Sequence, residues 1–316
     1  TNSDYFGEIS AMGDTVKIIK EPEITVKEYA RGTQITPQDL DDEDFSLVVD
    51  KANYFAFKVD DIEEAHSHVN FQSLASDRAA YRLADQYDQE VLGYLAGWKQ
   101  SAISSVAGTA NDTVSGSKAV SSAESNELLD SMLVDAADFN GGSANNSIVV
   151  QPRGGGDGVV TTAAHASPMA VLARMSRKLD QQFVDKDGRW IVIDPVFAEL
   201  LKDEDSRVMN SDFVSSSNEL KNGMVFSNLH GFKVYMSNNL PAKGNGPTGA
   251  TATGSTHYGV IVAGHGSAVA TAEQINKTET YRDPDSFADI VRGMHLYGRK
   301  ILRPEALTRA FYVSKY

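Results

Sequence analysis

The stretch FQSLASDRAAYRLADQYDQEVLGYLAGWKQ, residues 71–100, carries a helical pattern around which the rest of the chain can be arranged. Its apolar residues recur at steps of three and four, the spacing of one face of an α-helix. These are Phe71, Leu74, Ala75, Leu83, Ala84, Tyr87, Val91, Tyr94, Leu95 and Trp98. A helix of this length spans roughly 40 Å, more than one small domain needs. Two interpretations are open: a spine with chain on both sides, or a long amphipathic helix packed on a sheet.

The residues before this helix have β-strand patterns. Residues 1–12 show little pattern and are expected to form an arm, whereas 15–20, 24–29, 45–49 and 54–59 resemble strands. Phe55, Phe57 and Val59 are predicted to share one face, because side chains alternate along a strand. Residues 13–60 therefore indicate a long two-stranded β excursion. An isolated hairpin is only marginally stable, so we expect it to lie on something else, most economically another copy of the chain.

The residues after the helix alternate irregularly between helical and strand patterns. Helices are predicted over 124–139 and from Ser167-Pro168, where Ser is a good cap and Pro suits the first turn. The apolar stripe of that second helix is Met169, Leu172, Met175, Leu179 and Phe183. Strands are predicted at 148–150, 190–193, 232–236, 258–263 and 268–272, and a short helix after Asp194-Pro195. The order is not a regular βαβ series, so the predicted fold class is α+β.

The composition and net charge of the chain exclude several classes of function. The 316 residues have a net charge of −14, which argues against tight nonspecific binding of nucleic acid by the chain as a whole. Cysteine is absent, which excludes thiolate metal sites and Cys nucleophiles. No apolar run approaches the roughly 20 residues of a membrane span, so a soluble product is expected.

Motifs for chemistry are weak throughout. The loop Gly154–Gly158 lacks the Lys-Ser/Thr of a phosphate loop, and Gly264-His265-Gly266 has no surrounding βαβ unit. The seven histidines show no metal-ligand spacing, and no G-x-S-x-G elbow exists. We therefore predict no catalytic, cofactor-binding or metal-binding residues. An unrelated acidic hydrolase or binding protein stays open as a third hypothesis, and it would need a deep pocket with perturbed pKa values.

Charge is unevenly distributed along the chain. The acidic run consists of Asp39, Asp41, Asp42, Glu43 and Asp44, and the C-terminal cations are Arg292, Arg299, Lys300, Arg303 and Arg309. The plain interpretation is a solvated acidic face and lysines and arginines at the edge of a core. The alternative is that the acidic run of one copy contacts the basic segment of another. We take these ten residues as candidates for contacts between subunits.

Six local stretches follow one another in a recognisable order. They are FAFKVDD at 55–61, KLD at 178–180, GRWIVIDP at 188–195, NG at 222–223, GFKVYMSNNLP at 231–241 and RPEA at 303–306. In this order they resemble segments of the major capsid proteins of tailed bacteriophages, which have the Hong Kong 97-type fold. No single motif is diagnostic; the specificity lies in their order over roughly residues 13–316.

The resemblance implies a division of the chain. The expected parts are an N-terminal arm at 1–12, an extended β-hairpin loop at 13–60, a spine helix of the peripheral domain at 61–101, a mainly axial domain at 102–275 and a return to the peripheral domain at 276–316.

The resemblance also implies a function. We expect a structural, non-enzymatic protein of the virion that assembles in the host cytoplasm as hexamers and pentamers of an icosahedral head around double-stranded DNA. Portal, scaffolding and cement proteins would be further partners, DNA contact would be weak and nonspecific, and no membrane or cofactor is involved. The alternative is an encapsulin-type nanocompartment shell, which has a similar fold and encloses an enzyme.

Overall fold

The structure is a computed structural model that describes residues 15–19, 44–49, 51–60, 71–97, 128–139, 148–150, 165–202, 228–243, 256–284 and 286–315. The chain divides into two compact units. The first contains residues 1–83 and 269–302, and the second contains 84–268 and 303–316. The predicted arm at 1–12, the predicted strand at 24–29 and the loop Gly154–Gly158 lie outside the described residues.

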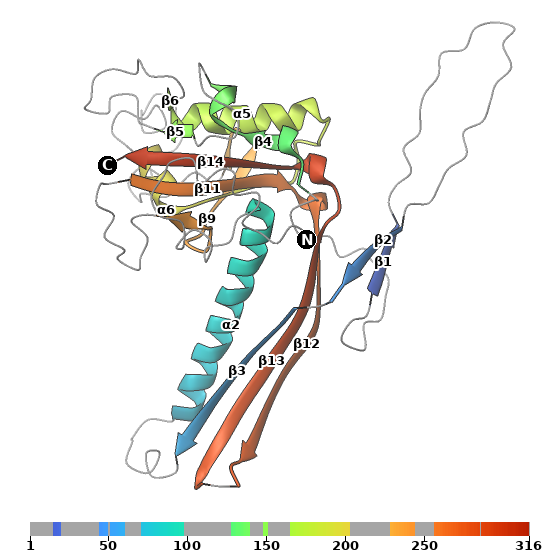
Figure 1. Cartoon of the computed structure of the whole chain (residues 1–316), viewed down its shortest axis with the longest axis vertical. Coiled ribbons are helices and arrows are strands. Elements are labelled where there is room, and N and C mark those ends of the chain that lie inside the picture. The colour runs from blue at the N-terminus through green and yellow to red at the C-terminus, as the bar shows by residue number, and fades with distance from the viewer. Residues whose placement is uncertain are drawn as a thin grey trace, which may run out of the picture. The chain divides into compact units, whose positions relative to one another are not determined.

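The first unit contains two antiparallel sheets (Figure 1). Strands β1 (Thr15–Ile19) and β2 (Asp44–Val48) pair with each other. Strand β13 (Ala288–Ile301) lies between β12 (Val269–Arg282) and β3 (Lys51–Asp60). The expected single excursion over 13–60 is therefore corrected at its C-terminal end: β3 belongs to a sheet with strands more than two hundred positions later.

Strand β3 shows why its sequence alternates. Phe55, Phe57 and Val59 are half-buried on one face, and Tyr54 and Ala56 are exposed on the other. The prediction that the three apolar residues share a face is confirmed. A one-residue change of register would exchange the two faces, so this alternation also helps to specify the pairing with β13.

Helix α2 runs from Phe71 to Ala96, as the periodicity predicts, and the boundary between the two units falls inside it, after Leu83. Its expected beginning at 61 and Trp98 lie outside the described residues. Among residues 75–97, whose burial the structure describes, the fully buried ones are 93–97 at the C-terminal end, including Tyr94, Leu95 and Ala96. Leu83, Tyr87 and Val91 on the predicted apolar face are only half-buried. The role of α2 as a spine stays a prediction.

The second unit is organised on a nine-stranded mixed sheet in the order β6-β5-β14-β11-β7-β9-β8, with β10 paired to β11 and β4 paired to β14 (Figure 1). The strands are β4 (Leu133–Val134), β5 (Ile148–Val150), β6 (His165–Ala166), β7 (Arg189–Ile193), β8 (Asn228–Leu229), β9 (Phe232–Met236), β10 (Ala242–Lys243), β11 (Thr256–His265) and β14 (Leu307–Lys315). Short 3₁₀ turns, η6 (Gly266–Ala268) and η7 (Pro304–Ala306), adjoin the long strands.

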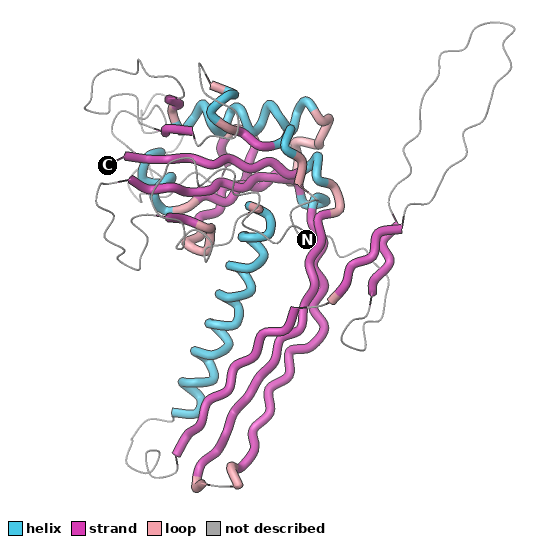
Figure 2. The backbone as a smooth tube through the Cα atoms, viewed as in Figure 1, coloured by secondary structure: helices cyan, strands magenta, loops and turns pink. Residues whose placement is uncertain are grey.

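Two capped helices pack on this sheet (Figure 2). Helix α5 (Pro168–Gln181) begins after Ser167, whose hydroxyl accepts a hydrogen bond from Ala170 N. Helix α6 (Pro195–Leu201) begins after Asp194, which accepts from Phe197 N. Both starts were predicted from the cap-proline pairs.

The buried residues of α5 are Pro168, Val171, Leu172, Met175 and Leu179, and the predicted stripe member Met169 is only partly buried. Phe183, predicted as its last member, is instead 96% exposed. The helix ends at Gln181, and the φ of +56° at Phe183 takes its backbone out of the helical direction.

The helix predicted over 124–139 is wrong in its described part, 128–139. This segment forms η3 (Asp130–Met132), strand β4 and η4 (Ala136–Asp138). Strand β4 pairs in parallel with β14, and the Thr308 hydroxyl donates to Met132 O at 2.7 Å. Because sheet pairing uses the backbone groups that a helix would need, the helical spacing of the apolar residues does not produce a helix here.

Candidate interaction surface

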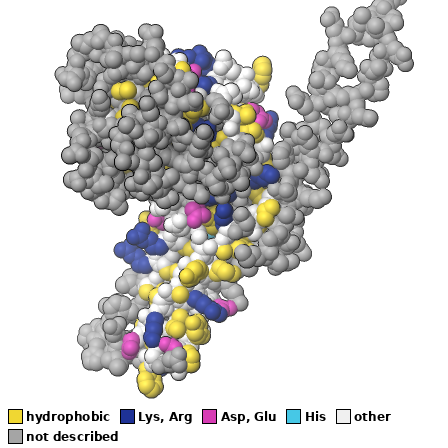
Figure 3. All heavy atoms as spheres, viewed as in Figure 1, with side chains coloured by type: hydrophobic (Ala, Val, Ile, Leu, Met, Phe, Trp, Pro, Cys, Tyr) yellow, Lys and Arg dark blue, Asp and Glu magenta, His cyan; other side chains and the backbone are white. Residues whose placement is uncertain are grey.

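One face of the three-stranded sheet presents large apolar side chains to solvent. The register places Tyr54 opposite Met294, and Arg292 opposite both Ala56 and Glu279. Directly opposed residues lie on the same face, so these side chains form one surface. Tyr54 is 80% exposed, Tyr281 43% and Met294 40%. Yellow side chains along this part of the molecule are visible in Figure 3.

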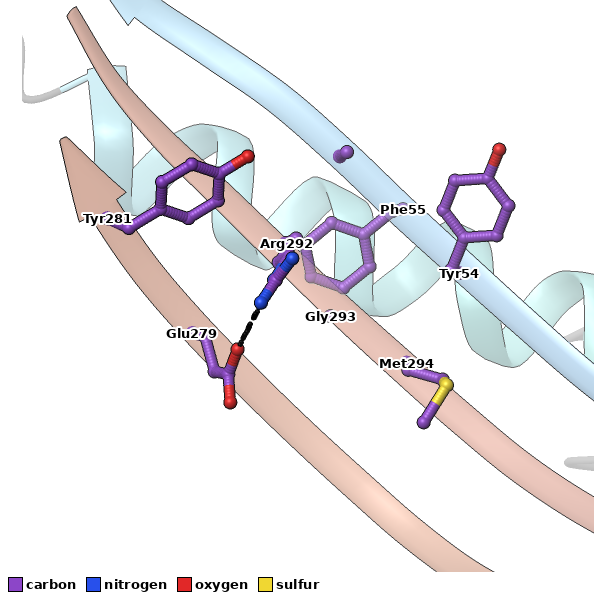
Figure 4. Close-up of a pocket in the computed structure, with 8 residues that line it drawn as sticks. Tyr54, Phe55, Glu279, Tyr281, Arg292, Gly293 and Met294 are labelled. Atoms are coloured by element: carbon purple, nitrogen blue, oxygen red, sulfur yellow. Dashed lines mark hydrogen bonds and ion pairs between the residues drawn. The ribbon is translucent and has the colours of Figure 1, made fainter. Parts of the chain in front are cut away.

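These residues border an open hollow of about 510 Å³ (Figure 4). Its lining residues are Tyr54, Phe55, Ala56, Glu279, Tyr281, Arg292, Gly293 and Met294. A Cβ on Gly293 would stand 2.4 Å from Cε1 of Phe55, so the phenyl ring occupies the space that a side chain there would need. Packing of an aromatic ring on a facing glycine is a known means of stabilising such a pair of strands.

The charges beside the hollow are neutralised within the sheet. Arg292 Nη2 lies 2.8 Å from Glu279 Oε2, and its guanidinium stacks 5.1 Å from the centre of the Tyr281 ring (Figure 4). The hydrogen bond to Glu279 raises the pKa of Arg292, and the nearby negative charge adds to this effect. An exposed pair of this kind contributes little to stability. The resulting surface suits an uncharged or apolar partner.

The same neutralisation extends along the sheet. Lys58 Nζ lies 2.8 Å from Asp283 Oδ2, and Arg282 Nη1 lies 3.3 Å from Asp289 Oδ1. Both pairs join residues of different strands or their connections, and both are partly exposed to solvent.

The predicted contact residues do not form one cluster. Asp39, Asp41, Asp42 and Glu43 lie outside the described residues, and Asp44 is the first residue of β2. Arg292, Arg299 and Lys300 lie on β13 of the first unit, whereas Arg303 and Arg309 belong to the second.

Their environments also differ. Arg299 and Lys300 are half-buried, and exposed Arg303 lies 3.2 Å from Glu305 through Nε. Arg309 is only 2% exposed on β14, which argues against it as a contact on a subunit surface. The sequence pattern did not predict the burial of Arg309, because that burial depends on strands that are distant along the chain. It missed Tyr54, Tyr281 and Met294, which become neighbours only through the pairing of β3, β13 and β12.

A buried polar cluster lies in the second unit. Asp194 accepts hydrogen bonds from Phe197 N and the Tyr312 hydroxyl at Oδ1, and its Oδ2 lies 2.7 Å from His257 Nε2. The three residues are between 0% and 3% exposed. Because they come from the start of α6 and from β11 and β14, the cluster ties these elements together inside the core.

Metal ligands do not gather in the part of the chain that the structure describes. In those residues, no group of three or more His, Cys, Asp or Glu is placed to hold a metal ion. No helix in the same part of the chain is both long and apolar enough to cross a membrane.

Comparisons with known proteins are informative at the level of structure. No protein-family profile and no curated protein sequence matches the chain. Among solved structures, a chain from Mycobacterium phage Che8 is similar, with a TM-score of 0.61 and 22% identity over 95% of this chain and 85% of that one. The capsid of Cyanophage P-SCSP1u has a TM-score of 0.59 and 17% identity over 96% and 84%. The capsid of Ralstonia phage GP4 has a TM-score of 0.57 and 10% identity over 97% and 85%.

These likenesses run through both compact units, because each covers at least 95% of the chain. They confirm the capsid-type α+β architecture that the order of segments predicted. The finer division into arm, loop, spine helix and two domains stays a prediction. The chain has the fold of a tailed-phage major capsid protein.

Proposed function

We propose that this chain is a structural, non-enzymatic subunit that associates with copies of itself as hexamers and pentamers of an icosahedral phage head enclosing double-stranded DNA. The observation that carries the proposal is the similarity to phage capsid structures over nearly the whole chain. The encapsulin-type shell gains no support from these structures. The product is then a virion protein assembled in the host cytoplasm, with portal, scaffolding and cement proteins as further partners.

The charge of the chain suits a container for DNA. A net charge of −14 disfavours tight binding of the phosphate backbone. A wall that held its genome tightly would hinder packaging and ejection, so weak and nonspecific DNA contact is part of the proposal.

The exposed sheet face supplies one surface for self-association. Tyrosine, methionine and arginine are enriched at protein interfaces, and a neutral apolar surface allows subunits of like net charge to approach. Tyr54, Tyr281, Arg292 and Met294 have this composition. The proposed acidic–basic contact between copies loses support at three of its cations, because Arg309 is buried and because Arg292 and Arg303 form ion pairs with Glu279 and Glu305.

The test is electron microscopy and light scattering of the purified protein, with its native assembly partners present. We expect closed shells containing nuclease-protected double-stranded DNA. A protein that stays monomeric under these conditions contradicts the proposal. Shells that contain a co-purified enzyme in place of DNA would establish the nanocompartment alternative.

A second experiment tests the acidic run. Reversal of Asp41, Asp42 and Asp44 to Lys should weaken assembly and preserve the subunit fold, and added salt should weaken wild-type assembly because exposed charges are screened. The matched control reverses Asp185, Asp187 and Glu199, which are exposed in the second unit. Equal assembly of both triple variants across salt concentrations would exclude an electrostatic role for the run.

A further inference from the structure

The chain joining the β1–β2 pair to the three-stranded sheet crosses β13 at a glycine. The ladder between β13 and β3 ends at Tyr297 opposite Lys51, and the next residue of β13 is Gly298. The chain just before β3 does not continue this ladder. It passes over Gly298, with Leu47 2% and Val49 0% exposed.

Gly298 is required by space. A Cβ at this position would stand 2.5 Å from Val48 O, 3.1 Å from Val48 C and 3.1 Å from Val49 Cα. All three are backbone atoms, so no side-chain rotation relieves the overlap. The φ of Gly298 lies outside the left-handed region, so the backbone angle alone would accept alanine. A glycine within a strand commonly marks such a close approach of two backbones.

Two other glycines show how specific this contact is. For a Cβ on Gly293, in the same strand, the three nearest atoms all belong to the phenyl ring of Phe55, and a ring can rotate. A Cβ on Gly266 would meet no atom within 4 Å. Substitution by alanine at these three positions therefore forms a graded series. The new methyl group would meet open space at 266, a side chain at 293 and backbone atoms at 298.

The alternation of β13 shows on which side the crossing occurs. Residues two apart in a strand share a face, so Gly298 lies on the face that carries Arg292 and Met294. The connection from β2 thus crosses β13 on the face that carries Arg292 and Met294, and Leu47 and Val49 beside the crossing are buried.

We infer that Gly298 is a positioning residue that sets the direction in which the β1–β2 pair leaves the sheet. A side chain there displaces the backbone at Val48 and Val49 and releases Leu47 from its buried position. The consequence for assembly rests on the proposed function, in which the excursion begun by this pair lies on a neighbouring subunit.

The first test measures the subunit itself by hydrogen-exchange mass spectrometry. In Gly298→Ala we expect the amides of Asp44–Val48 to exchange at least about tenfold faster, through local opening, with β3 and β13 protected as in the wild type. Gly266→Ala should match the wild type, and Gly293→Ala should affect β3 and leave β2 unchanged. Unchanged exchange at β2 in a folded Gly298→Ala protein would overturn the inference.

A second variant covers the case in which Gly298→Ala does not fold. Leu47→Ala adds no atom where the chain crosses Gly298, but it removes the buried side chain of the residue that precedes Val48. It should accelerate exchange in β2 and lower the yield of closed shells. Wild-type exchange and yield in Leu47→Ala would overturn the inference.

The assembly arm separates this inference from the proposed function. Wild-type protein and Gly266→Ala should form shells equally, and Gly298→Ala should lose at least about tenfold in shell yield, since every subunit carries the displaced connection. If the wild type forms no shells, the proposed function fails, while the exchange experiment still decides the role of Gly298. If Gly298→Ala forms wild-type shells, the positioning role is wrong and the proposed function stands.

Discussion

The nine-stranded sheet and the three-stranded sheet bury their side chains very differently. The nine-stranded sheet and its helices enclose a continuous core that includes Leu172, Phe197, Phe232 and Tyr312. In the three-stranded sheet Tyr54 is 80% exposed, and so is Phe287, which directly precedes β13. Contact between an apolar face of this kind and water is unfavourable in a subunit that has not assembled. The difference predicts that substitutions in the second unit act on folding, whereas those on the exposed face of the first act on association.

The largest effect is expected at the buried cluster of the second unit. Asp194→Ala removes the carboxylate that accepts the hydrogen bond of the Tyr312 hydroxyl and contacts His257, and it removes the cap of α6. We expect a loss of about 3–5 kcal/mol in the free energy of unfolding, measured by urea denaturation of the unassembled subunit. Glu199→Ala, exposed on the same helix, is the control and should stay within about 0.5 kcal/mol. A loss below about 1 kcal/mol for Asp194→Ala would contradict a structural role for the cluster.

A smaller effect is expected on the face of the three-stranded sheet that carries the half-buried Phe55. Phe55→Ala removes the half-buried ring that packs across Gly293 and stacks on Phe57 at 6.1 Å. The expected loss is about 1–2 kcal/mol, less than for a fully buried phenylalanine.

A double-mutant cycle makes this prediction sharper. Gly293→Ala should cost less in the Phe55→Ala background than in the wild type, because the phenyl ring is what the new Cβ would meet. Equal costs in both backgrounds would show that the ring and the glycine do not interact.

The exposed face should show almost no effect on folding and a clear effect on association. Tyr54→Ser should change the free energy of unfolding by no more than about 0.5 kcal/mol and should reduce shell yield in light scattering. The control is Tyr235→Ser on β9, which is 55% exposed. If Tyr54→Ser destabilises the subunit as much as Phe55→Ala, the distinction between the two faces of the sheet is wrong.

The smallest effect concerns the pH dependence of α2. Burial raises the pKa of Asp88 above 3.8, and the neighbouring Asp85 raises it further. The folded state therefore holds this proton more tightly than the unfolded state, so stability falls as pH rises from 3.8 through the raised pKa. Asp88→Asn should remove this decline and stabilise the subunit at neutral pH by well under about 1 kcal/mol, because solvent screens the charge. A steeper decline in the variant, followed by thermal unfolding from pH 3 to 7, would contradict the assignment.

Local patterns were sufficient for much of the secondary structure. The three- and four-residue spacing predicts α2, and the structure begins it at Phe71. The cap-proline pairs at Ser167 and Asp194 predict α5 and α6, since a capped start needs only a few adjacent residues. The alternation in β3 predicts which face carries Phe55. The order of similar segments indicated the capsid-type fold, which the comparisons with solved structures confirm.

The candidate surface depended on contacts between distant parts of the chain. The pairing of β3 with β13 brings Tyr54 beside Met294 across 240 positions. The alternation in β3 shows which of its residues share a face, but it does not identify the partner strand. Likewise, pairing with β14 converts 133–134 to strand inside a segment with helical spacing, and the surrounding sheet buries Arg309.

The sequence by itself determined where α2, α5, α6 and β3 lie, because helix periodicity, capping and strand alternation are properties of neighbouring residues. Only the tertiary structure decided that Gly298 must be a glycine, since the atom that excludes a side chain there, Val48 O, belongs to a strand 250 positions earlier. Steric exclusion between backbones is a matter of distance in space, which the order of residues does not state.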